Sequence, residues 1–123
     1  MKQLFILCIL FFPLSLLNGQ NEPVAGHWEG TITREGKEWT VWLDLQSISN
    51  GFAGTVDFPD YGLYATPLKT VRIEGPVVYL EMIDKSDTVR FNGKLVGERL
   101  NGQWSGIGVT ASFEIHRTKQ LPI

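Results

Sequence analysis

Cysteine is almost absent from this sequence, and the single one, Cys8, lies in an apolar stretch at the N-terminus. The rest of the chain has no thiol for a disulfide, a nucleophile or a thiolate metal site. Histidine is also scarce, with two among 123 residues, and the Gly-x-Ser-x-Gly motif of serine hydrolases does not occur. A serine triad needs both a histidine base and a suitably placed nucleophile. We therefore expect no nucleophilic enzyme and no cofactor.

Clustered positive charge is missing as well. The formal net charge is −2, and Lys and Arg residues are scattered along the chain. Binding to a phosphate backbone needs a basic patch or stripe. We therefore expect no nucleic-acid partner.

A long hydrophobic run occurs only at the N-terminus, from Leu4 to Leu17, just after Lys2. It is shorter than the roughly 20 residues that a membrane-spanning helix needs. Its length fits the apolar region of a secretory signal peptide, about 7–15 residues. We expect residues 1–20 to be a signal peptide and residues 21–25 a linker, with no membrane span after cleavage and a secreted or periplasmic location. The alternative is an uncleaved membrane anchor.

Helical periodicity is not found beyond residue 26. Apolar and polar residues alternate instead, which is typical of antiparallel strands with one face in solvent. Short turn signals rich in Gly, Asp and Asn separate these runs, and the length suits one modest core. The pattern predicts an all-β fold, a single up-and-down antiparallel barrel of 8–10 short strands over residues 26–117, followed by a tail at 118–123. The clearest alternating runs are 39–45, 52–58, 78–82, 89–95 and 109–115.

Glycine recurs between two apolar residues, as apolar–x–Gly–x–apolar, at Gly30, Gly54, Gly93 and Gly102. On the inner face of a strand, glycine permits bending and leaves room for a large neighbour. This favours the filled interior of a small barrel. The alternative places Gly93 and Gly102 in Asn-Gly hairpin turns.

The tripeptide Gly26-His27-Trp28 resembles the start of the first strand in calycin barrels, the group that contains the lipocalins. The resemblance implies that Trp28 closes the barrel floor and that a basic residue of the last strand lies across it. Arg117 follows the last alternating run at even spacing, so it is the residue placed for that role.

A second resemblance covers most of the chain beyond residue 26. It is to the small barrel module at the N-terminus of secreted bacterial serine hydrolases. The chain ends at Ile123, where the hydrolase domain would begin, so the resemblance implies a fold and a setting rather than an activity. The residues that carry it are Gly26-x-Trp28-x-Gly30-Thr31, the stretch 54–62, Pro67-Leu68 and Leu100-x-Gly102-x-Trp104.

Candidate ligand-binding residues gather in the segment 57–64, where we place the barrel mouth: Asp57, Asp60, Tyr61 and Tyr64. The tyrosines suit a binding rim because each has an apolar body and a polar tip. The two aspartates have an alternative role in ordinary turn chemistry beside Gly62.

Aromatic residues dominate the predicted inner face and form either a packed core or the wall of a ligand cavity. Trp42 has the opposite parity, which makes it a candidate contact for a protein partner. The inward set is Trp28, Trp39, Phe52, Phe58, Phe91, Trp104 and Phe113.

Both histidines are predicted to point outward. With Glu29 and Glu114, His27 and His116 could form a surface metal site, but two solvated side chains on neighbouring strands are the simpler expectation, and we predict no metal site.

These observations predict a non-catalytic binding or accessory module outside the cytoplasm, whose ligand is a small apolar molecule or a partner protein. The alternative is an accessory subunit of a separately encoded secreted serine hydrolase. A third interpretation is an enzyme of unrecognised type.

Overall fold

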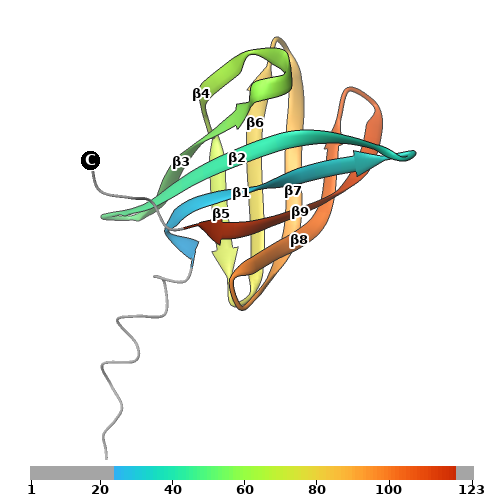
Figure 1. The fold of residues 1–123 in the computed structure, drawn as a ribbon. Helices are drawn as coiled ribbons and strands as arrows, with labels where there is room; N and C mark the ends of the chain where they lie inside the picture. Colours follow the sequence, from blue (N-terminus) through green and yellow to red (C-terminus); the bar gives the residue numbers. More distant parts are fainter. Residues whose placement is uncertain (1–23, 119–123) are drawn as a thin grey trace, which may run out of the picture.

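The computed structural model describes residues 24–118, which form one antiparallel sheet of nine strands curled into a half-barrel (Figure 1). The predicted all-β, up-and-down fold is confirmed. The predicted signal peptide and most of the predicted linker and tail lie outside the described residues. The strands are β1 (Gly26–Arg34), β2 (Lys37–Ile48), β3 (Gly51–Phe58), β4 (Leu63–Pro67), β5 (Thr70–Glu74), β6 (Val77–Asp84), β7 (Asp87–Val96), β8 (Arg99–Gly106) and β9 (Val109–Thr118).

The strand order across the sheet is β4-β3-β2-β1-β9-β8-β7-β6-β5. Each strand thus pairs with a neighbour in sequence, and β1 pairs with β9, as short connections predict. The edge strands β4 and β5 follow one another in the chain. At their junction the Leu68 N–H donates to the carbonyl of Gly54 on β3 (2.9 Å), and the Lys69 N–H donates to that of Glu81 on β6 (2.7 Å). This junction, here called the seam, joins the two edges of the sheet.

The alternating strand directions divide the turns between two ends of the half-barrel. The β1–β2, β3–β4, β6–β7 and β8–β9 connections gather at one end, here called the open end (Figure 1). A short 3-10 helix, Pro59–Tyr61, belongs to the β3–β4 connection there. The start of β1 and the end of β9 lie at the other end, here called the floor. Residues near strand ends can therefore meet even when they are far apart in sequence.

The inner face of the sheet holds the core, as the period-two pattern predicts. Among the described residues the buried side chains are all apolar. Core packing extends slightly beyond the predicted domain, because Val24 is buried and β9 runs to Thr118. The largest fully buried side chains are Trp28, Phe91, Leu43, Leu80, Met82, Leu100 and Ile115.

Gly93 and Gly102 lie opposite one another in the middle of the β7–β8 ladder. The hairpin-turn alternative for these glycines is therefore wrong, because the turn comes later, between Val96 and Arg99. The tip of the Phe113 ring would lie 2.8 Å from a Cβ at Gly93, so the missing side chain makes room for it. Glycine on the inner face thus accommodates a large neighbour, as predicted.

Candidate ligand-binding site

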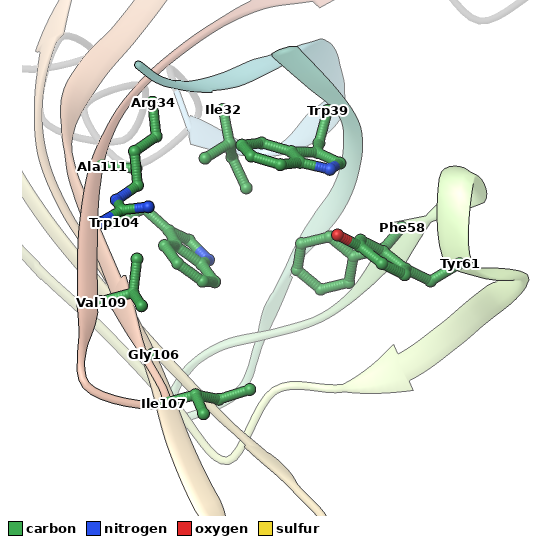
Figure 2. A pocket seen from close by; sticks show the side chains of 10 residues that line it. All are labelled: Ile32, Arg34, Trp39, Phe58, Tyr61, Trp104, Gly106, Ile107, Val109 and Ala111. Carbon is green, nitrogen blue, oxygen red and sulfur yellow. The ribbon is translucent and has the colours of Figure 1, made fainter. Parts of the chain in front are cut away.

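A hollow of about 330 Å³ lies inside the open end (Figure 2). The β1–β2 hairpin, the 3-10 helix and the β8–β9 hairpin supply its walls, so it depends on turns that the up-and-down topology brings together. Its lining is largely aromatic and aliphatic, with an arginine at one side. The lining residues are Ile32, Arg34, Trp39, Phe58, Tyr61, Trp104, Gly106, Ile107, Val109 and Ala111.

A second hollow of about 420 Å³ adjoins the first and extends to the β6–β7 turn. The two share four lining residues: Phe58, Tyr61, Trp104 and Ile107. The two hollows therefore adjoin across the open end, and together they are called the trough.

Some of the inward-facing aromatic residues form a packed core, and others line a cavity, so both roles considered for them occur. Trp28, Phe91 and Phe113 are buried, and the Phe91 and Phe113 rings meet edge to face with centroids 5.2 Å apart. Trp39 and Trp104 are only partly buried and line the trough. The interior is therefore packed at the floor and in the middle of the half-barrel, whereas the open end is hollow.

Of the predicted rim residues, Tyr61 alone lines the trough, with 64% of its surface exposed. Tyr64 lies on the outer face instead, where its ring centroid is 6.4 Å from that of Trp42. Trp42 is half-buried. The sequence pattern placed Trp42 on the outer face but gave no sign that Tyr64 packs beside it.

Asp57 and Asp60 line neither hollow. Asp57 accepts a hydrogen bond from the Ala65 N–H (2.6 Å), and Asp60 accepts one from the Thr40 N–H (2.7 Å). Carboxylates commonly stabilise turns by accepting from backbone N–H groups in this way. The two aspartates thus hold the β3–β4 connection against the sheet, which agrees with the turn interpretation.

Ile107 is a trough residue that the sequence analysis did not single out. It occupies the β8–β9 turn with φ +51° and is 64% exposed. A β-branched residue in the left-handed region is a true outlier. The only sequence signal was the position of this isoleucine between Gly106 and Gly108, where Asn or Asp is usual.

The indole nitrogen of Trp104 has no hydrogen-bond partner among the described residues, although it is buried. An unsatisfied buried donor is unfavourable by about 1–3 kcal/mol. Figure 2 shows this nitrogen on the edge of the ring that faces Phe58 and Tyr61 across the hollow. Trp104 therefore places an unpaired N–H donor in a wall that is largely apolar apart from Arg34.

At the floor, Arg117 lies over Trp28, as the resemblance to calycin barrels implied. The two residues are paired across the β1–β9 ladder, and the guanidinium carbon is 4.8 Å from the centroid of the indole. The Arg117 side chain also donates to the Glu98 carboxylate (2.8 Å) and to the carbonyl of Ala25. The indole N–H of Trp28 donates to the carbonyl of Val24 (3.1 Å), which holds the chain that leads into β1 against the floor.

His27 is outward-facing but not freely solvated, because its side chain is only 15% exposed. Nδ1 lies 2.7 Å from Asp44 and Nε2 lies 2.9 Å from Glu29. Burial acts to lower the pKa of His27, but hydrogen bonds to both carboxylates outweigh it and raise the pKa above the ordinary 6.5. Only the protonated ring can donate to both partners at once.

The His27 contacts predict a pH-dependent stability. Because the folded state has the higher pKa, stabilisation by His27 is fully present below about pH 6.5 and is lost as the pH rises through the raised value. We expect the free energy of unfolding, measured by urea denaturation, to fall between pH 6 and pH 9. His27→Gln should flatten this profile, whereas His116→Gln, on an exposed histidine, should retain it. A wild-type profile that rises with pH over this range would contradict the prediction.

His116 does not join His27 in a metal site. It is exposed on β9, opposite Glu29 in the ladder, while His27 engages Asp44 and Glu29. Within residues 24–118, no group of three or more His, Cys, Asp or Glu side chains is placed to hold a metal ion.

Comparison with known proteins gives no match: no family model, no curated protein and no solved structure matches this chain. Over residues 24–118, no helix is long and apolar enough to cross a membrane.

Proposed function

We propose that this protein is a non-catalytic binding module that takes up a small apolar molecule at the open end of the half-barrel. The observation that carries the proposal is the trough, which combines two partly buried tryptophans with aliphatic side chains around a hollow of about 330 Å³. Small-molecule sites are typically concave and mostly apolar, with few polar groups. The setting that we propose is outside the cytoplasm, on the strength of the N-terminal apolar run and the calycin-like sequence features.

The packed floor supports this division of roles. A ligand cavity needs rigid walls, because ordering a loose site on binding reduces the affinity. The Trp28–Arg117 contact fixes the floor, and the buried rings of Phe91 and Phe113 fill the middle of the half-barrel below the trough. The open end can then stay hollow without loss of the fold.

Exposure of Ile107 is a further argument. An exposed apolar residue in a strained conformation lowers stability, and such strain tends to occur at functional positions. Contact between Ile107 and an apolar ligand would bury this side chain.

The accessory role beside a secreted hydrolase stays a prediction. Trp42, the residue considered for docking, has the ring of Tyr64 beside it on the outer face, which leaves less of the indole free for a partner.

Titration with apolar molecules tests the proposal. Fatty acids, sterols or an environment-sensitive dye should change the tryptophan fluorescence saturably, because Trp39 and Trp104 line the site. We expect micromolar affinity, which corresponds to about −8 kcal/mol. A ten-carbon chain provides enough apolar surface, at about 0.8 kcal/mol for each buried methylene before the costs of binding are subtracted. Failure of every probe to saturate would refute the proposal.

Two exposed residues of similar size provide a matched pair of variants. Ile107 is 64% exposed at the trough, and Val96 is 62% exposed at the opposite end of the half-barrel. Ile107→Asn should weaken binding about fivefold, equivalent to loss of about 1 kcal/mol of apolar contact. Val96→Asn should leave the affinity unchanged. Equal effects of the two substitutions would place the bound molecule elsewhere.

A further inference from the structure

The trough has a polar requirement that an entirely apolar ligand cannot meet. The buried Trp104 Nε1–H has no acceptor among the described residues. Buried donors in folded proteins nearly always have a partner, from the protein, from water or from a ligand. Because both hollows are lined by Trp104, a molecule in the trough lies against the residue that needs the acceptor.

A positive charge lies at the same wall. Arg34 lines the hollow, and Figure 2 shows its guanidinium turned toward Trp104. Its ion pair with Glu35 is long, at 3.5 Å, and both side chains are well exposed, so this contact holds the arginine only weakly. The guanidinium keeps donors for a further anion, since it has five N–H groups.

We propose that the bound molecule is an amphiphile with a hydrogen-bond acceptor, best an ionised carboxylate. This acceptor takes a hydrogen bond from the indole N–H of Trp104 and lies beside Arg34. This inference rests on the proposed function and adds the chemistry of the head group. The apolar part would lie along Trp39, Phe58 and Ile107. In the first hollow a positively charged head group fits poorly, because it brings no acceptor for the indole and is repelled by Arg34. The second hollow is lined by one residue of each charge, Asp84 and Lys85, and favours neither sign.

Three probes with matched carbon chains test the head group: decanoate, methyl decanoate and decylammonium. They present an anionic acceptor, a neutral acceptor and a cation without an acceptor. We expect decanoate to bind most tightly, with decylammonium at least tenfold weaker. Arg34→Gln should weaken decanoate about fivefold and leave the ester unaffected, because only the ion loses an electrostatic partner.

The NMR signal of the Trp104 indole N–H shows directly whether this group donates a hydrogen bond to the ligand. In the nitrogen–proton correlation spectrum of protein labelled at tryptophan, the Trp104 signal should move downfield with decanoate, as a newly formed hydrogen bond requires. Trp104→Phe identifies this signal by its loss and keeps an aromatic ring, and it should weaken decanoate and the ester alike. Val96→Asn should change neither affinity.

The outcomes distinguish failure of the head-group inference from failure of the proposed function. Equal binding of the three probes, or a stationary Trp104 signal at saturation, overturns the head-group inference and leaves the binding module standing. Absence of binding by all three probes, together with no response to sterols or dye, overturns the proposed function and this inference with it.

Discussion

Trp28→Ala should destabilise the fold by about 3–5 kcal/mol, as other large aromatic truncations in cores do. Trp28 is fully buried, and its indole connects the Val24 carbonyl, the core and the guanidinium of Arg117. Removal leaves a cavity at the floor and deprives Arg117 of its ring contact. For a domain with a total stability of about 5–15 kcal/mol, this loss threatens folding. Urea denaturation followed by circular dichroism measures it.

Two further variants test whether the position of Trp28 at the floor causes the expected loss of stability. Trp42→Ala removes the same side chain from the outer face, where it is half-buried, and should cost only about 1 kcal/mol. Arg117→Ala should cost about 0.5–2 kcal/mol, the range of a partly desolvated cation–π contact. Similar losses in the Trp28 and Trp42 variants would show that the floor has no special role in stability.

Gly102→Ala should also be strongly destabilising, by about 1–3 kcal/mol or more, as in overpacked cores. A Cβ at Gly102 would lie 2.1 Å from the Asn92 carbonyl oxygen and 2.5 Å from Cα of Gly93. Both are backbone atoms of the neighbouring strand, so neither can move without distorting the β7–β8 ladder. Thermal and urea unfolding of the variant should show the loss.

The control for this substitution lies in the same hairpin. Gly97 has φ +61° and open space around it, and asparagine tolerates this left-handed conformation. Gly97→Asn should change the stability by no more than about 0.5 kcal/mol, as for ordinary surface positions. If Gly102→Ala were equally mild, close strand approach at Gly102 would not be the reason for glycine there.

Much of the fold was predictable because its signals are local. The alternation along 109–115 fixes which side chains of β9 face inward, and this parity carries through to Arg117. The glycines between strands indicated tight turns, and short turns favour pairing between strands that follow one another in the chain. With β1 and β9 joined, Arg117 then has to lie beside Trp28.

The site was less predictable because it depends on contacts between segments far apart in sequence. Tyr61 belongs to the predicted mouth, but Tyr64, three residues later, lies on the outer face. Asp57 was assigned to ligand binding, yet its partner is the backbone of Ala65 in the next strand. His27 meets Asp44 only through the β1–β2 register, which no local pattern reveals.

Arg34 and Ile107 were missed for a different reason. Both lie in or beside tight turns, where polar and apolar residues carry no periodic signal. Ile107 nevertheless violates turn chemistry, because an isoleucine occupies a position that favours Asn, Asp or Gly. A residue that opposes its local conformation is a better pointer to a site than one that agrees with it.

We expect the seam to be the most easily deformed part of the half-barrel. Long ladders of backbone hydrogen bonds join the strands in the middle of the sheet, whereas β4 and β5 are not neighbours in the sheet order, and the bonds of Leu68 and Lys69 join its edges. Releasing them costs about 0.5–1.5 kcal/mol each, far less than breaking a ladder. We therefore expect the width of the interior to depend on how far the two edges separate at the seam as well as on the hollow at rest.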